Sequence, residues 1–178
     1  MKTIYAIILT LYHSSVFAGG YFSDIINYNK CSIDDSNIQS NKLTNDAIIS
    51  TFINYDFEHS NILSILKHKE INDSYVKNKH NKSINDKIQI IKSNSDYYSY
   101  YIGEENSFII CASIQTNEFK SKTGISINTN KSDVESILKK NITGNMAIIQ
   151  SLEGFIKISV LFNNDKVDRI TYKNTYID

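Results

Sequence analysis

The chain of 178 residues carries 19 basic and 19 acidic side chains, so its formal net charge is zero. This balance gives no electrostatic reason to expect nucleic acid or an anionic membrane surface as a partner. Beyond residue 18 the length suits one domain with a single hydrophobic core, since domains of roughly 100–150 residues are commonest.

The first eighteen residues have the pattern of a secretory signal peptide. Lys2 supplies a positive charge, residues 4–11 are mostly apolar, and Val16-Phe17-Ala18 places small residues where a signal peptidase reads them. No cysteine directly follows Ala18, as a bacterial lipid anchor would require. We therefore expect a soluble bacterial protein without a membrane anchor, periplasmic or secreted after cleavage near Ala18.

The next segment, residues 19–44, is polar and lacks sustained periodicity, so we expect an irregular arm with one short helix or strand. The spacing of apolar residues from Asn45 predicts a short helix. A second helix is expected from Ser60, which is a good N-cap residue. Residues 69–86 are mostly polar, and we interpret them as a long loop.

Three strands are predicted next, over residues 87–92, 96–102 and 107–116, with turn residues between them. In the third strand, strict alternation would place Cys111 on the face opposite to its neighbours. Those neighbours, expected to share one face, are Phe108, Ile110, Ala112 and Ile114.

The second half of the chain repeats this order of elements. The residues "GISIN" (124–128) predict a short strand, and Asn130 or Ser132 is expected to cap a helix. Residues 146–151, 155–162 and 166–173 then alternate as three strands, and Asn163-Asn164-Asp165 has the character of a hairpin turn.

A phrase common to both halves supports a repeated architecture. The pattern Ser-x-x-x-Ser-Ile-Leu-Lys begins at Ser60 and again at Ser132, and three strands are expected after each copy. Its apolar residues would face a core. We predict an α+β fold in which residues 45–178 form a single domain. Its two tandem helix-plus-antiparallel-meander units, about 45–118 and 119–178, would form a two-layer sandwich with one open sheet face.

The second half also resembles a known family. The stretch "GISINTNKSDVESILKKN", followed by "FIKISVLFNNDKVDRITY", is similar to the β-lactamase-inhibitor-protein-like domains, which include the SmpA/OmlA outer-membrane assembly proteins. Lys131-Ser132-Asp133-Val134 and Ile137-Leu138 match the helix of that pattern. The resemblance covers about residues 122–173 and, more faintly, 59–116. It implies tandem units whose concave sheet grips a partner protein, and it implies no catalytic residues.

The two cysteines, Cys31 and Cys111, allow a single intramolecular pairing. Exported proteins usually meet an oxidising compartment, which favours a disulfide between them. One buried and one mobile thiol is the alternative.

No catalytic or metal-binding motif stands out. His59 and His68 lie nine positions apart, off the spacing of metal ligands on one helix face, and His80 falls in the polar loop. We interpret all three as solvated. The acidic pairs Asp34-Asp35 and Glu104-Glu105 are expected in exposed turns. We expect no cofactor and no metal.

The most unusual surface candidate is "DYYSYYI", residues 96–102. Tyr98 and Tyr100 should share one face of the strand, and Tyr97 and Tyr101 the other. Whichever pair lies on the open side would offer rigid amphipathic contact area. Alternatively, tyrosine is present there simply as a good strand former. The sequence thus favours a non-enzymatic exported protein that binds another protein, of inhibitor, immunity or envelope-scaffold type. The alternative is a small exported hydrolase with an unrecognised site.

Overall fold

The computed structural model describes residues 25–33, 38–78, 81–104 and 106–175. Within these residues the chain has an α+β fold with three α-helices and one mixed eight-stranded sheet. The elements in chain order are η1 (Tyr28–Cys31, a 3-10 turn), β1 (Ser40–Thr44), α2 (Asp46–Thr51), η2 (Phe52–Asp56, a π-helical turn), α3 (His59–Ile65), β2 (Glu70–Lys77), β3 (Asn85–Ser93), β4 (Asp96–Ile102), β5 (Ser107–Ile114), α4 (Lys131–Leu138), β6 (Met146–Gln150), β7 (Ile156–Asn163) and β8 (Lys166–Asn174).

The strands follow the order β1-β6-β7-β8-β5-β4-β3-β2 across the sheet. Only β1 and β6 pair in parallel; every other neighbouring pair of the described strands is antiparallel. The two halves of the chain meet at the centre, where β5 pairs with β8 over Cys111–Ile114 and Ile170–Lys173. The last strand of each meander is therefore central, and β1 and β2 form the edges.

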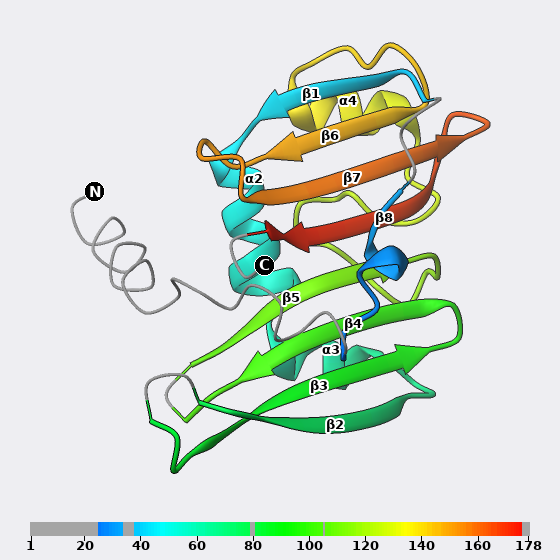
Figure 1. Ribbon diagram of the computed structural model, residues 1–178. Coiled ribbons are helices and arrows are strands. Elements are labelled where there is room, and N and C mark those ends of the chain that lie inside the picture. Colours follow the sequence, from blue (N-terminus) through cyan, green and yellow to red (C-terminus); the bar gives the residue numbers. More distant parts are fainter. Residues whose placement is uncertain (1–24, 34–37, 79–80, 105, 176–178) are drawn as a thin grey trace.

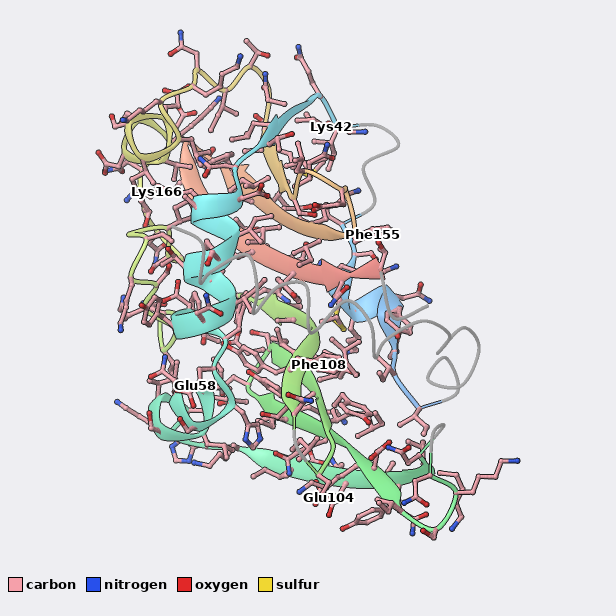
Figure 2. All side chains as sticks on the ribbon, turned by 90° about the vertical axis from the view of Figure 1, so that its left-hand side faces the viewer. Lys42, Glu58, Glu104, Phe108, Phe155 and Lys166 are labelled. Carbon is pink, nitrogen blue, oxygen red and sulfur yellow. A yellow bond between two sulfur atoms is a disulfide. The ribbon has the colours of Figure 1, made fainter. Side chains whose placement is uncertain are left out.

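The helices cover one face of the sheet, and η1 lies on the other (Figure 1). Seen edge-on, the sheet separates the helices from η1 (Figure 2). We call these the helix side and the arm side. The main core fills the helix side, where Phe52, Ile62 and Leu66 from the first half and Val134 and Leu138 from the second are buried against the strands. The two halves thus share one continuous core.

Much of the predicted secondary structure is confirmed. The helix after Asn45 is present, and the Asn45 side chain accepts a hydrogen bond from the Ile48 amide at 3.1 Å, as an N-cap does. Both predicted meanders are present as β3–β5 and β6–β8. Of the two alternatives for the later helix, Asn130 is the N-cap residue. In the repeated phrase, Leu66 and Leu138 are both buried on the helix side.

Three local predictions were wrong. Helix α3 begins at His59, with Glu58 rather than Ser60 at the N-cap position. The segment predicted as a loop over 69–86 contains β2, an eight-residue strand. The "GISIN" segment is irregular and not a strand, although Ile125 and Ile127 are buried in the core. The arm 19–44 ends in the short strand β1.

A β-bulge in β5 overturns the predicted sidedness of that strand. Ser99 opposes Cys111 while Tyr100 opposes Ile109, so Ile110 is an extra residue in the pairing. As a result Ile110 and Cys111 both belong to the cluster on the arm side, together with Phe108. Ala112 and Ile114 belong to the helix side, as expected of the strand beyond the bulge.

Candidate protein-interaction surface

The four candidate tyrosines of β4 divide between the two faces as the alternation predicted. Tyr98 and Tyr100 lie on the helix side, with 0% and 1% of their surface exposed. The Tyr100 hydroxyl donates to the Phe57 carbonyl at 3.0 Å, and its ring lies 4.8 Å from the His59 ring. These two residues are part of the core and cannot contact a partner in this fold.

Tyr97 and Tyr101 lie on the arm side. Tyr97 is buried beside Ile26, and Tyr101 is half-buried and stacks on Phe108 at 4.9 Å between ring centroids. Burial raises the pKa of all four β4 tyrosines above the ordinary value of 10.0. The expected tyrosine contact surface is thus buried at three of its four positions, and a binding role stays a prediction for Tyr101 alone.

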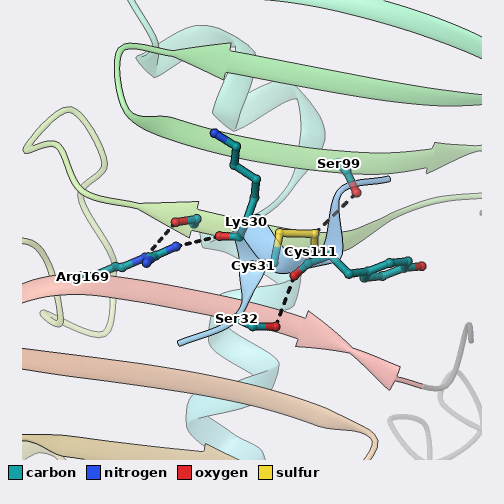
Figure 3. Close-up of a disulfide and its surroundings, with 8 residues drawn as sticks. Lys30, Cys31, Ser32, Ser99, Cys111 and Arg169 are labelled. Atoms are coloured by element: carbon teal, nitrogen blue, oxygen red, sulfur yellow. Dashed lines mark hydrogen bonds between the residues drawn. A yellow bond between two sulfur atoms is a disulfide. The ribbon is translucent and has the colours of Figure 1, made fainter. Parts of the chain in front are cut away.

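The arm is attached to the centre of the sheet by the disulfide between Cys31 and Cys111, as predicted (Figure 3). Arg169 on β8 reinforces this attachment. Its Nη2 donates to the Lys30 carbonyl at 2.7 Å and its Nε to the Ser113 hydroxyl at 3.1 Å. One guanidinium therefore joins the arm to both central strands.

The arm also corrects the prediction of an open sheet face. Ile26 and Cys31 form a second buried cluster with Ile88, Tyr97 and Ile110 on the arm side. Over β3–β5 the centre of this face is therefore covered by residues 25–31.

The structure describes two of the three histidines considered from the sequence. His59 is half-buried, contrary to the prediction that it is solvated, and its Nε2 lies 2.6 Å from the Gln89 Oε1. His68 is exposed, as predicted, and His80 lies outside the described residues. Among the residues that the structure describes, no cluster of three or more His, Cys, Asp or Glu could hold a metal ion.

Of the two acidic pairs named from the sequence, only one residue lies within the described part of the chain. Glu104 is exposed, as expected, whereas Asp34, Asp35 and Glu105 lie outside the described residues.

Two of the three buried carboxylates among the described residues, none of them predicted from the sequence, hold main-chain segments in place. Asp96 accepts hydrogen bonds from the Gln115 and Thr116 amides at 2.7 and 3.0 Å, which fixes the chain where it leaves β5. Asp56 accepts from the Lys122 amide at 2.8 Å and from the Ser121 hydroxyl. Burial raises the pKa of the Asp56 carboxyl. Both side chains hold loops in place, and main-chain donors occupy their oxygens.

The strand β2 forms the most accessible part of the sheet. It pairs with β3 over its whole length, Glu70–Lys77, and no described segment pairs with its outer side. Its odd-numbered residues share the helix side, since Ile71 opposes the core residue Ile91. On that side Ile71 is 43% exposed and Tyr75 is 67% exposed. A long edge strand thus carries two large exposed apolar side chains on one face.

A chain of hydrogen bonds fixes Asp73, which lies between Ile71 and Tyr75 on β2. One Asp73 oxygen accepts from the Gln89 side-chain amide at 2.8 Å, and the other lies 3.3 Å from the Lys87 ammonium. The Gln89 amide nitrogen faces Asp73, so its oxygen faces His59, which must donate through Nε2. The carboxylate is thereby held in place at the edge.

The opposite edge is shorter and partly covered. Strand β1 has five residues, and Thr143 donates to the Asn41 side chain at 3.1 Å. Gly144 lies so close to Gln39 that an added Cβ would be 2.3 Å from the Gln39 carbonyl oxygen. The loop after α4 therefore packs against the start of β1, and nothing comparable contacts β2 among the described residues.

Comparisons with protein-family models, with curated protein sequences and with solved structures returned no match to this chain. The resemblance to β-lactamase-inhibitor-protein-like domains therefore stays a prediction. Across the part of the chain that the structure describes, no helix has the length and apolar character needed to cross a membrane.

Proposed function

We propose that this chain is an exported, non-enzymatic protein-binding domain that docks its partner along the open edge of its sheet, at β2. The observation that carries this proposal is the eight-residue strand Glu70–Lys77, with Ile71 and Tyr75 exposed on one face. The Cys31–Cys111 disulfide supports export, because disulfides persist mainly in oxidising compartments.

Docking at this edge is expected because the main chain of an edge strand has groups without a strand partner. Along its outer side an edge strand presents N–H and C=O groups that another extended segment can pair with. Main-chain hydrogen bonds then supply affinity, and alternate side chains supply selectivity. In β2 those side chains are Ile71 and Tyr75, and large apolar or aromatic groups are the usual anchors of an interface.

The finer architecture is part of the proposal. We propose that α3 with β3–β5 and α4 with β6–β8 are tandem helix-plus-meander units, as the repeated phrase and the resemblance suggest. Both units place a helix on the same side of the sheet (Figure 1). An inhibitor, immunity or envelope-scaffold role fits such a domain, with the edge rather than an open face as the contact.

A hydrolase, the alternative from the sequence, has less support. The buried carboxylates Asp56 and Asp96 accept main-chain hydrogen bonds, and the Nε2 of His59 is engaged with Gln89. A third buried carboxylate, Asp86, accepts from the Asn78 side-chain amide at 2.9 and 3.1 Å. A shallow polar depression beside α4 is lined by Asn130, Lys131, Ser132, Glu135, Asn164, Asp165 and Lys166.

Site-specific photo-crosslinking in cells tests the proposal. A photoreactive amino acid replaces Asn72 on β2, and the matched control carries it at Ser136 on α4; both positions are exposed. We expect a discrete crosslinked protein from position 72 and none from position 136. Absence of a product at position 72, or identical products at both positions, would contradict docking at the β2 edge.

A further inference from the structure

We infer that the occupant of the β2 edge is a second copy of this chain, paired antiparallel with Tyr75 opposite Tyr75 of the second copy. This inference rests on the proposed function, because it names the partner of the same edge. It makes the protein a symmetric dimer in which one sheet continues through both copies.

Symmetry limits the ways in which β2 can pair with itself. Two identical antiparallel edge strands are related by a two-fold axis perpendicular to the sheet, and the interface is self-complementary. That axis keeps both helix sides on the same side of the joined sheet. Opposed residues must then share a face, so their residue numbers must sum to an even value. Each allowed register is therefore centred on one residue.

The charges along β2 select among these registers. Centring on Asp73 places that carboxylate opposite its own copy and Lys69 opposite Lys77. Centring on Ser74 places Lys77 opposite Ile71 and Asp73 opposite Tyr75. Like charges directly opposite each other destabilise a strand pair, and apolar–charged pairs contribute little. Neither register is favourable.

Centring on Tyr75 gives a complementary arrangement. Asp73 then faces Lys77 of the second copy, and by symmetry this pair occurs twice, once on each side of the two tyrosines. Opposite charges and aromatic pairs are the cross-strand contacts that stabilise antiparallel sheets. All of these side chains lie on the helix side, and Tyr75 is the most exposed of the large apolar residues on β2.

Within a single copy, the two charged side chains that would form these contacts already lie accessible at the edge. Gln89 and Lys87 hold Asp73 at the edge, and a carboxylate can accept further hydrogen bonds beyond those two. Lys77 is exposed and forms no ion pair among the described residues. The second copy would supply the missing partner for Lys77.

The size of the contact sets the expected affinity. The paired stretch runs from Asn72 to Asn78, which buries less area than the roughly 1,200 Å² of a standard interface. We therefore expect a reversible dimer with a dissociation constant on the order of 100 μM. Sedimentation equilibrium over a range of protein concentrations measures this constant.

A pair of charge-reversal variants tests the register. In Lys77→Asp, aspartates face aspartates, and in Asp73→Lys, lysines face lysines, so each variant alone should dimerise at least about tenfold more weakly. An equimolar mixture restores two Asp–Lys pairs in a mixed dimer and should recover the wild-type constant. Unchanged dimerisation of the single variants, or no recovery in the mixture, would overturn the inference.

A cysteine crosslink tests the register without changing these charges. In Tyr75→Cys the two new thiols face each other across the axis, with Cα atoms roughly 4.5–5.5 Å apart, within the range of a disulfide. In the matched control Ile71→Cys, also exposed at this edge, the two thiols would be about 27 Å apart. Mild oxidation should yield a covalent dimer from the first variant only, and crosslinking of the Ile71 variant instead would contradict this register.

The outcomes separate this inference from the proposed function. A chain that stays monomeric and fails to crosslink through position 75 refutes self-pairing. If the photoreactive group at position 72 still captures a different protein, docking at the edge stands with another occupant. If position 72 captures nothing, both proposals fall.

Discussion

The Tyr100 hydroxyl donates a hydrogen bond of 3.0 Å to the Phe57 carbonyl, and this joins β4 to the chain directly after the π-helical turn η2. Both residues are buried. A tyrosine taken from the sequence as a surface candidate thus fixes the connection between α2 and α3 to the sheet.

Removing the Tyr100 hydroxyl should destabilise the fold. In Tyr100→Phe the Phe57 carbonyl loses a buried donor, and we expect the free energy of unfolding to fall by about 1–2 kcal/mol. Tyr98→Phe is the matched control. Its hydroxyl lies 3.4 Å from Asp96, which has better donors, so the loss should be smaller. Equal losses in urea unfolding would show that the Phe57 contact has no special weight.

The disulfide should contribute strongly to stability. Cys31 and Cys111 are 80 positions apart, and closing such a loop stabilises by roughly 4 kcal/mol in the chain-entropy model. The Cys31→Ala/Cys111→Ala double variant should lose up to this amount in urea unfolding. It should also become sensitive to proteases within residues 25–31 before the sheet unfolds. An arm that stays as resistant as in the wild type would mean that Arg169 and apolar packing suffice to hold it.

Two glycines allow a matched test of the contact between the loop after α4 and β1. Gly144 and Gly154 both have positive φ, +89° and +77°, but only Gly144 has a neighbour that an added Cβ would hit. Gly154→Ala should cost about 1 kcal/mol for backbone strain alone. Gly144→Ala should cost roughly 2 kcal/mol more, because the Gln39 main chain must move. Similar melting temperatures for the two variants would contradict this contact.

Buried tyrosines should make the fold sensitive to alkali. Burial raises the pKa of Tyr97, Tyr98, Tyr100, Tyr101 and Tyr172 above the ordinary value of 10.0. The folded state therefore holds these protons more tightly than the unfolded state. The contribution of these tyrosines to the free energy of unfolding is complete below pH 10 and is lost as the pH rises above it. Tyrosinate absorbance should show these five groups ionising together with unfolding; ionisation of all tyrosines before loss of far-ultraviolet circular dichroism would disprove it.

Strand β7 of the second meander could be predicted because apolar residues recur at alternate positions along it. In β7, Ile158, Val160 and Phe162 alternate with more exposed residues, so the sequence has a hydrophobic period of two. The sequence of strand β2 has no such hydrophobic period. Most of its residues are exposed on both faces, so "EINDSYVK" has the composition of a loop, and only its pairing with β3 makes it a strand.

The candidate site was predicted only in part for the same reason. Alternation placed Tyr98 and Tyr100 opposite to Tyr97 and Tyr101, which is correct. It could not reveal that the arm covers Tyr97, because contacts between distant segments leave no local pattern. Cysteine pairing was predictable, since two cysteines permit one bridge. The edge formed by β2 had no signal beyond the exposed Ile71 and Tyr75 within a polar stretch.

The extra residue in β5 has a consequence for the covalent structure. Had the strand run without interruption, Cys111 would oppose Tyr98 and its sulfur would point among the helices, away from Cys31. As the extra residue, Ile110 shifts the pairing register of β5 with β4 by one position, so the Cys111 sulfur points toward the arm. Deletion of Ile110 would remove the bulge and still leave Cys111 opposite Ser99, so a strand without the extra residue would keep its sulfur toward the arm. The direction of the Cys111 sulfur is therefore set by its pairing with Ser99 on β4 and not by strict alternation from the start of β5.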